Sequence, residues 1–172
     1  MQKSSSKIPY LNVNAGPNDP NWVDRLKEEY LILIQYIKDN KEQDNDWVEI
    51  KCKDRSGKQW EGKCWTFYEM VKYEFKLEFE IPANYPLTPI ELKLPELDGK
   101  TEKMYHGGKI CQDIHFAPLW AKESPKLGIA HALSLALGPW LSVEIPNMIY
   151  HCLLYTSPSP RDLSTSRMPS SA

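Results

Sequence analysis

The sequence lacks any long hydrophobic run, and this absence excludes two classes of protein. No segment of the 172 residues approaches the roughly 18 consecutive apolar residues that a membrane-spanning helix needs. Residues 1–7 also lack the apolar core of a signal peptide. We therefore expect no membrane span and a location in the cytoplasm, with the nucleus as a second location.

An excess of either charge is also lacking. The 21 Lys and Arg residues and 23 Asp and Glu residues give a formal net charge of −2, and the two signs are interspersed. Nucleic-acid-binding domains usually have a basic face, and proteins held at lipid surfaces have a basic cluster. We therefore expect no nucleic acid among the partners and no electrostatic attachment to a membrane.

Cysteine is scarce, and its spacing excludes the common metal and redox motifs. The four cysteines are Cys52, Cys64, Cys111 and Cys152, and no two of them have the C-x-x-C spacing of zinc and thioredoxin sites. Disulfides are not expected in a reducing compartment. The sequence therefore predicts neither a metal site nor another cofactor.

Two phosphate-binding loops are absent as well. A cysteine phosphatase needs an arginine six positions after its cysteine, and Ala117 holds that position after Cys111. A glycine-rich loop of the Walker type is also missing. These absences exclude a cysteine phosphatase and a nucleoside triphosphatase with a Walker-type phosphate-binding loop.

What is present is the composition of one folded domain with a different tail. Hydrophobic residues make up 41% and charged residues 26% of the chain, which is ordinary for a globular domain. We expect a flexible arm at residues 1–18, a folded domain at 19–152 and a disordered tail at 153–172. Eleven of the tail's twenty residues are Ser, Pro or Thr, a composition that does not fold. Because the tail begins like a translated sequencing adapter, we expect that it is not native.

Hydrophobic spacing and capping residues predict the helices. Asp19-Pro20 predicts a helix start, and apolar residues at steps of three and four extend this helix to about Asn40. Ser124-Pro125 predicts a second helix, which Gly138-Pro139 ends. A last short helix is expected near Pro146.

Alternating apolar residues and turn residues predict four consecutive strands between these helices. The strands are residues 47–52, 60–67, 72–81 and 90–94. Because strands and helices are segregated along the chain, we expect an α+β fold, in which helices pack on one face of a four-stranded antiparallel meander.

One cysteine lies in an unusual loop. Gly107 and Gly108 come shortly before Cys111, inside a 26-residue segment, residues 95–120, without clear periodicity. Paired glycines adopt dihedrals closed to other residues and let the backbone approach another molecule closely. A long irregular segment in a compact domain is more often functional than not. The loop therefore predicts that Cys111 is a presented, nucleophilic thiol, with an inert buried thiol as the alternative.

Four side chains are candidates to assist this thiol. His115 is a candidate base or hydrogen-bond partner, and packing of the loop is its alternative role. Lys103 and Lys109 are candidate cationic neighbours, and Lys103 is also a candidate for stabilising an anionic intermediate; a solvated surface lysine is the alternative. His131 is conceivable as the partner in a Cys–His dyad, although no protease signature surrounds it.

A set of short segments, in one order over residues 8–150, resembles a known family. The segments are Asn14-Ala15-Gly16-Pro17, residues 22–30, Asp44-Asn45-Asp46-Trp47, Gly62-Lys63-Cys64-Trp65, Lys72-Tyr73-Glu74-Phe75, residues 95–101, Gly107-Gly108-Lys109-Ile110-Cys111, Leu119-Trp120-Ala121, Leu137-Gly138-Pro139-Trp140-Leu141 and Val143-Glu144-Ile145-Pro146. Together they resemble the ubiquitin-conjugating superfold and, within it, the family of conjugating enzymes for ubiquitin-fold modifier 1, the carriers of ufmylation.

The resemblance implies a ubiquitin-conjugating-like catalytic domain at residues 19–152 with an extra N-terminal helix. Cys111 lies where the family has its catalytic cysteine. That cysteine accepts the modifier's C-terminal glycine as a thioester from the activating enzyme, and a ligase helps to transfer it to a substrate lysine. The implied partners are therefore the ubiquitin-fold modifier, its activating enzyme, its ligase and lysine-bearing substrate proteins, and we expect a monomer.

The resemblance also implies supporting residues. Where most ubiquitin carriers have His-Pro-Asn, the family has Thr-Ala-Lys and this chain has Thr101-Glu102-Lys103. Lys103 is thus the second candidate catalytic residue, and Thr101 and His115 are candidate supporting residues. Between the cysteine and the following histidine the family commonly has Leu-Thr-Asp, and this chain has Gln112-Asp113-Ile114.

Two other functions remain as alternatives. One is a non-catalytic scaffold with the conjugating fold, but inactive variants of the superfold typically lack the cysteine, which is present here as Cys111. The other is a cysteine hydrolase that uses Cys111 with His115 or His131.

Overall fold

The computed structural model describes residues 8–112 and 115–151. Its helical elements are α2 (Trp22–Glu42), the 3-10 turn η1 (Pro95–Leu97), α3 (Phe116–Glu123), α4 (Ile129–Ala132), the π-helical turn η2 (Leu133–Leu137) and α5 (Gly138–Tyr150). Its strands are β1 (Val48–Cys52), β2 (Gln59–Tyr68), β3 (Val71–Glu80), β4 (Met104–Tyr105) and β5 (Lys109–Ile110). Within these ranges no helix is long and apolar enough to span a membrane. The predicted tail at 153–172, Cys152 and the start of the predicted arm lie outside the described residues.

An antiparallel sheet forms the centre of the fold. Strands β1, β2 and β3 pair in chain order, so that Cys64 lies between Val48 on one side and Phe75 on the other. Alternate residues of β3, such as Phe75 and Leu77, are buried, while Lys76 between them is exposed. Period-two burial of this kind needs a covered face and a solvent face. The predicted α+β class is therefore confirmed, with an N-terminal helix and an antiparallel sheet.

The fourth predicted strand is shorter than expected. Within residues 90–94, only Lys93 pairs with β3, through two backbone hydrogen bonds of 2.9 and 3.1 Å with Glu78. Pro89 and Pro95 flank this segment, and a proline offers no N–H to a ladder. Lys93 also pairs with Lys109 of β5. Two isolated bridges thus connect β3, through Lys93, to the hairpin formed by β4 and β5.

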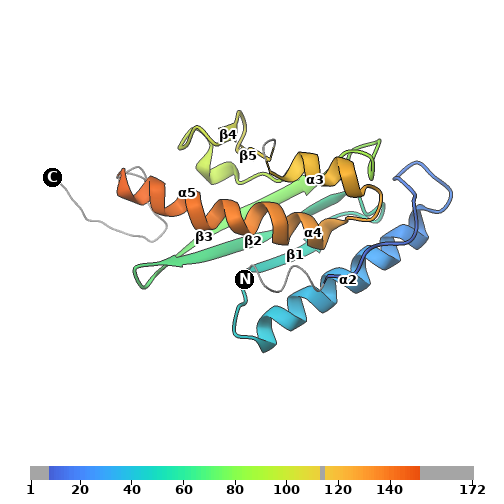
Figure 1. Cartoon of the computed structure of the whole chain (residues 1–172), viewed down its shortest axis with the longest axis horizontal. Helices are drawn as coiled ribbons and strands as arrows, with labels where there is room; N and C mark the ends of the chain where they lie inside the picture. The colour runs from blue at the N-terminus through green and yellow to red at the C-terminus, as the bar shows by residue number, and fades with distance from the viewer. Residues whose placement is uncertain (1–7, 113–114, 152–172) are drawn as a thin grey trace.

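The helices cover the sheet and fix its position relative to the hairpin. Figure 1 shows α4 and α5 as one nearly continuous rod that crosses β2 and β3, while α2 runs along the side of β1. Between these layers lie large side chains that are almost fully buried, including Trp60, Leu77, Leu92, Trp120 and Leu137. Burial of this apolar area is the main source of stability of the domain.

Gly138 and Pro139 do not end a helix, so that prediction is wrong. The Gly138 N–H donates to the carbonyl oxygen of Leu133, five residues earlier, in the π-helical turn η2. Proline normally breaks a helix because its ring meets the carbonyl of the residue four positions earlier, and a wider turn moves that carbonyl away. The chain is therefore helical from α4 through η2 to the end of α5, and Pro146 lies inside α5.

The buried face of α2 differs from the predicted apolar stripe. Val23, one of the apolar residues whose spacing predicts this helix, is 59% exposed. The buried positions are Trp22, Arg25, Glu29, Leu33, Tyr36 and Asn40. They also recur at steps of three and four, but two of them are charged. The helix is amphipathic as predicted. Its buried face, however, lies about one residue earlier in the sequence than the predicted apolar face, and it includes an internal ion pair.

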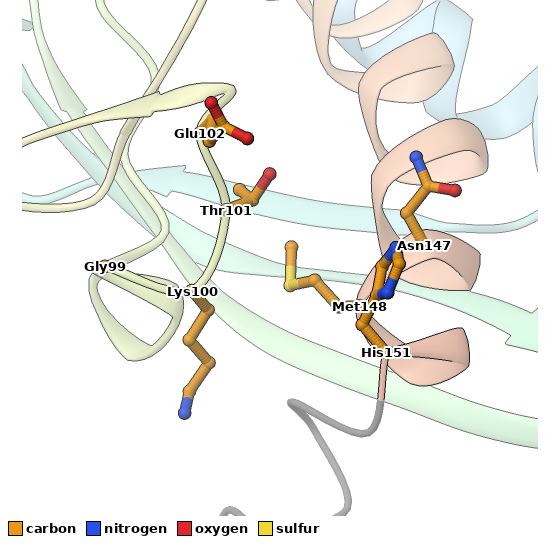
Figure 2. A pocket seen from close by; sticks show the side chains of 7 residues that line it. All are labelled: Gly99, Lys100, Thr101, Glu102, Asn147, Met148 and His151. Carbon is orange, nitrogen blue, oxygen red and sulfur yellow. The ribbon is translucent and has the colours of Figure 1, made fainter.

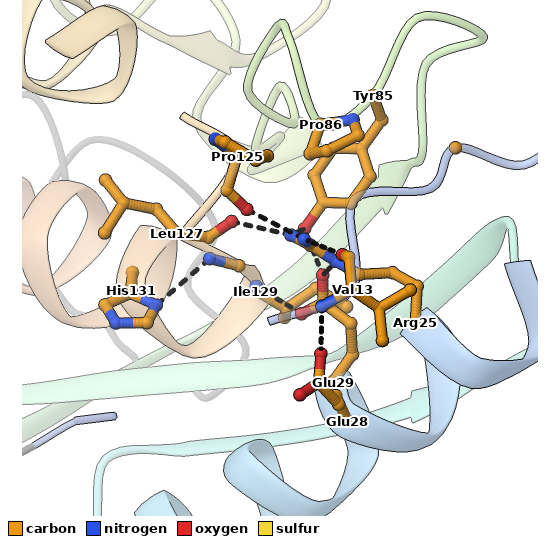
Figure 3. A network of polar contacts seen from close by, with 12 residues as sticks. Val13, Arg25, Glu28, Glu29, Tyr85, Pro86, Pro125, Leu127, Ile129 and His131 are labelled. Atoms are coloured by element: carbon orange, nitrogen blue, oxygen red, sulfur yellow. Dashed lines mark hydrogen bonds and ion pairs between the residues drawn. The ribbon is translucent and has the colours of Figure 1, made fainter. Parts of the chain in front are cut away.

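This ion pair joins three parts of the chain. The Arg25 Nε donates to Glu29 Oε2 at 2.9 Å, and both side chains are at least 98% buried. The remaining guanidinium nitrogens donate to backbone oxygens of Val13, Pro125 and Leu127, each at 2.8 Å. Figure 3 shows these carbonyls converging on the guanidinium from the N-terminal segment and from the segment before α4.

Part of the predicted N-terminal arm is packed. Leu11 and Ala15 are 3% and 1% exposed, and the Leu11 N–H donates to the Lys126 carbonyl oxygen at 2.8 Å. The Glu28 carboxylate accepts the backbone N–H groups of Asn12 and Val13. Residues 11–15 therefore lie against α2 and the segment before α4, whereas residues 1–7 of the arm lie outside the described residues.

Candidate active site

The candidate cysteine directly follows the β4–β5 hairpin. Between the two strands the chain turns through Gly107 and Gly108, whose φ angles are +88° and +86°. A Cβ atom on Gly108 would lie 2.6 Å from the carbonyl oxygen of Leu94. Positive φ and this close backbone approach both require glycine. The glycine pair therefore has dihedrals closed to other residues, as expected, and it closes a tight turn against a neighbouring segment of the same chain.

Cys111 itself is half-buried and holds a free thiol. Its N–H donates to the carbonyl oxygen of Lys103 at 3.0 Å, and its Sγ lies 3.9 Å from the hydroxyl of Tyr105. Cys64, in contrast, is 0% exposed, and burial raises the pKa of its thiol far above the ordinary range. Of these two thiols, only Cys111 is accessible at a loop.

The backbone of Lys103 holds the cysteine, while its side chain extends into solvent. Among the described residues, its ammonium group has no hydrogen bond or ion pair. The other candidate cation, Lys109, is engaged, since its Nζ lies 3.2 Å from Glu91 Oε2 and 5.5 Å from the ring centre of Tyr105. The free lysine of the two is therefore Lys103.

Two residues of α5 hold the Thr101–Lys103 loop in place. The Thr101 hydroxyl donates to Glu144 Oε1 at 2.7 Å and accepts the Lys103 N–H at 3.2 Å. The indole N–H of Trp140 donates to the Lys103 carbonyl oxygen at 2.9 Å. That oxygen also accepts the N–H of Cys111. A continuous set of hydrogen bonds therefore runs from α5 to the cysteine backbone.

Glu144 and Trp140 were not predicted from the sequence as site residues. They are four positions apart on one helix and so face the same direction. This spacing is the one local signal for the pair, and it does not indicate which loop they contact.

A cleft of about 340 Å³ opens beside the same loop. Figure 2 shows residues 99–102 on one side and the last turn of α5 on the other, with Thr101 and Met148 directed towards the space between them. The lining residues are Gly99, Lys100, Thr101, Glu102, Asn147, Met148 and His151. Thr101 and Glu102 of the predicted Thr-Glu-Lys motif thus line a cleft, and Lys103 beyond them contacts the cysteine.

Among the described residues, neither candidate histidine forms a hydrogen bond with the thiol. His115 is exposed next to the start of α3, and in the described part of the chain it forms no hydrogen bond with Cys111. His131 (Figure 3) is 3% exposed in a separate region. Its Nδ1 accepts the Gly128 N–H at 3.0 Å, and its ring stacks on Tyr10. A Cys–His dyad therefore has no support within the described residues.

No metal centre is present in the residues described. Groups of three or more His, Cys, Asp or Glu side chains placed to hold an ion do not occur in residues 8–112 and 115–151.

Comparison with known proteins places the chain in one family. The sequence profile of a family described as ubiquitin-fold modifier-conjugating enzyme 1 matches residues 1–155. The ubiquitin-fold modifier-conjugating enzyme 1 of Danio rerio is 55% identical over 149 residues, which are 86% of this chain and 89% of that protein. The protein of the same name from Nematostella vectensis is 56% identical over 149 residues, which are 86% and 88% of the two chains.

One mammalian relative and one solved structure were also found. The ubiquitin-fold modifier-conjugating enzyme 1 of Mus musculus is 56% identical over 145 residues, which are 84% of this chain and 86% of that protein. The structure of human ubiquitin-conjugating enzyme E2 G1 is similar with a TM-score of 0.46 and 17% identity, over 69% of this chain and 97% of that one. From the profile and the close relatives, the chain belongs to the family of ubiquitin-fold modifier-conjugating enzyme 1 and is an E2-type transferase.

Proposed function

We propose that Cys111 carries a ubiquitin-fold modifier as a thioester and transfers it to lysine side chains of substrate proteins. The observation that carries this proposal is the position of Cys111, a half-exposed thiol whose N–H is fixed by the Lys103 carbonyl oxygen and, through it, by α5. The relatives are named for the conjugation of a ubiquitin-fold modifier, which supports this modifier as the group that is carried.

In the first step the thiol of Cys111 exchanges with a thioester on the activating enzyme. Its sulfur, as the thiolate, attacks the carbonyl carbon of the modifier's last residue, and a tetrahedral oxyanion forms. The bond from that carbon to the sulfur of the activating enzyme then breaks, and the leaving thiolate takes up the proton that Cys111 lost. One thioester replaces another, so the protein has to present the thiol and stabilise a short-lived charge.

In the second step an amine replaces the sulfur. The neutral ε-amine of a substrate lysine attacks the same carbonyl carbon, an amide bond forms, and the carbon–sulfur bond to Cys111 breaks. The amine releases a proton, and the Cys111 thiol is regenerated. Donor and acceptor are on different proteins in both steps, so correct placement of the reacting atoms dominates the rate, and the ligase is expected to provide part of it.

Lys103 is the group we propose for charge stabilisation. Its ammonium is unpaired among the described residues, and its backbone is one hydrogen bond away from Cys111. A cation with this freedom can approach the oxyanion that forms on the carbonyl carbon bound to the Cys111 sulfur. In the test, Lys103→Ala protein is charged and then discharged to free lysine. A slower rate than wild type in either step is expected, and equal rates in both would refute the role.

Charging assays with Cys111 variants test the main proposal. Protein is mixed with the activating enzyme, ATP and the modifier, and is separated with and without reductant. Wild type should give one adduct that a thiol reductant removes, and Cys111→Ser should give an adduct that survives reductant, because an oxyester forms. Cys52→Ser is the matched control and should charge like wild type, since Cys52 is also a half-buried free thiol but lies on β1. A reductant-sensitive adduct on Cys111→Ala would refute the proposal.

A further inference from the structure

The chain that leads into Cys111 is held by a short backbone ladder. The Leu94 N–H donates to the Gly108 carbonyl oxygen at 2.7 Å, and the Ile110 N–H donates to the Leu92 carbonyl oxygen at 3.0 Å. These two bonds align residues 108–110 antiparallel to residues 92–94. In a regular antiparallel pair the two opposite residues exchange both of their hydrogen bonds, so Leu92 N–H would donate to the carbonyl oxygen of Ile110.

The ladder stops there, and a side chain replaces it. The Leu92 N–H donates instead to Oε1 of Gln112 at 3.3 Å, and Nε2 of Gln112 donates to the Ile90 carbonyl oxygen at 3.3 Å. One primary amide thus provides both the acceptor and the donor that a backbone strand would have offered. In the described part of the chain, Leu92 N–H has no other partner.

The backbone of Gln112 is tied in the other direction. Its carbonyl oxygen accepts the N–H groups of Phe116, at 3.1 Å, and Ala117, at 2.9 Å, in the first turn of α3. Gln112 therefore connects the segment 90–92 to α3, and Cys111 lies between Ile110, which is held by the backbone ladder, and Gln112, which is held by its side chain.

We infer that Gln112 is a positioning residue for transfer at Cys111. The inference rests on the proposed function. The side-chain amide fixes the chain directly after the cysteine, as the ladder fixes the chain directly before it and the Lys103 carbonyl oxygen fixes the Cys111 N–H. The ladder ends at Ile110, so Cys111 keeps a half-exposed thiol while both of its neighbours stay hydrogen-bonded to residues 90–92.

The burial of the partners makes the amide necessary. Ile90 and Leu92 are both 0% exposed, so water cannot replace a lost partner on either backbone group. A buried N–H and a buried carbonyl oxygen without partners are unfavourable, and the local backbone would shift to satisfy them. Gln112, which is bonded to these groups, directly follows Cys111. A shift of the backbone around Gln112 would therefore move the sulfur of Cys111.

Single-turnover transfer from a preloaded activating enzyme tests the inference. Gln112→Met has nearly the same length but neither donor nor acceptor, and Gln59→Met, at an exposed position of β2, is the matched control. For Gln112→Met, the maximal transfer rate should fall roughly tenfold, while the concentration that gives half of the maximal rate stays unchanged, because misplacement affects the reaction and not docking. Gln59→Met should behave like wild type in both.

A second variant separates positioning from general loss of structure. In Gln112→Glu, a protonated carboxylic acid can donate to Ile90 and accept from Leu92, but an ionised carboxylate cannot donate. The transfer rate relative to wild type at the same pH should therefore be near one at acidic pH and fall as the new carboxyl ionises, a pH profile that a role in folding alone would not produce.

The outcomes are distinct. Wild-type maximal rates for Gln112→Met, or a Gln112→Glu ratio that does not change with pH, would overturn the inference while wild-type charging still supports the proposed function. Absence of any thioester on the wild-type protein would instead refute the proposed function, and with it the inference.

Discussion

The carbonyl oxygen of Lys103 accepts two hydrogen bonds, one from the N–H of Cys111 at 3.0 Å and one from the indole of Trp140 at 2.9 Å. The first bond joins the candidate cysteine to the loop before it, and the second joins that loop to α5. The orientation of Cys111 therefore depends on α5. This helix begins at Gly138, which is 27 residues after the cysteine.

Removing the indole N–H should slow charging of the cysteine. In Trp140→Phe, most of the apolar contact remains but the Lys103 carbonyl oxygen loses one donor. We expect a loss of about 1 kcal/mol in the free energy of unfolding and a severalfold lower charging rate. Urea denaturation and thioester formation measure the two effects. Trp65→Phe is the control, because Trp65 is also 7% exposed but its indole has no hydrogen bond within the described residues. An equal charging rate in both variants would contradict the coupling.

For stability and for charging of Cys111, the hydroxyl of Thr101 should matter more than its methyl group. Thr101→Val keeps the shape but removes the donor to Glu144 Oε1 and the acceptor of the Lys103 N–H. Glu144 is only 7% exposed, so its carboxylate would lose a partner that water replaces poorly. We expect roughly 1–3 kcal/mol lower stability together with slower charging, both measured as for Trp140. Thr101→Ser retains the hydroxyl and should stay close to wild type; a Ser variant as impaired as Val would argue against the hydrogen bond.

Features that depend on neighbouring residues could be predicted from the sequence. The alternation in β3 arises because successive side chains of a strand point to opposite faces, and it is visible without any partner. The unusual dihedrals before Cys111 were likewise predictable, since two adjacent glycines, Gly107 and Gly108, can both adopt positive φ. The α+β class followed from such local signals.

Features that depend on distant partners could not be predicted in this way. Trp140 is 37 positions from Lys103, and Glu144 is 43 positions from Thr101. Arg25 and Glu29 resemble solvent-facing charges in the sequence, and only the carbonyl groups of Pro125 and Leu127, about 100 residues later, make their burial favourable. Helix α3 was missed because eight residues with an internal Pro118 show too little periodicity.

The buried ion pair of α2 gives a prediction for stability. Arg25→Met fills similar space but leaves the Glu29 carboxylate 98% buried without its cation and leaves three backbone carbonyl groups without a donor. Burial already raises the pKa of Glu29, against the opposing effects of Arg25 and of hydrogen bonds from Tyr85 and Ile129. We expect a loss of roughly 3–5 kcal/mol in the free energy of unfolding, measured by urea denaturation.

A surface pair provides the comparison for that variant. Lys63 Nζ lies 3.7 Å from Glu74 Oε2, and both side chains are more than 40% exposed. Lys63→Met should change stability by at most about 1 kcal/mol, because solvent screens exposed pairs. A similar cost for Lys63→Met and Arg25→Met would show that the internal network has no special role.

His131 should make the protein less stable in weak acid. Burial lowers the pKa of His131 from an ordinary value of 6.5 to about 4, and the Arg25 charge adds to this effect while the Ile8 backbone opposes it. Its Nδ1 accepts the Gly128 N–H, so a proton on that nitrogen would face another donor. Between pH 6.5 and about 4 the unfolded chain therefore binds a proton that the folded protein does not. Stability is complete above this window and falls as the pH drops through it, by on the order of 3 kcal/mol.

Urea denaturation at several pH values, with a variant that cannot titrate, tests this assignment. In His131→Gln, the side-chain oxygen at the third helical position of α4 can still accept the Gly128 N–H, as in a capping box. The variant should lose much less stability than wild type between pH 6.5 and 4. His115→Gln removes an exposed histidine and should keep the wild-type dependence on pH. If wild type and His131→Gln lose stability in parallel through this range, then protonation of His131 does not limit the stability of the fold in acid.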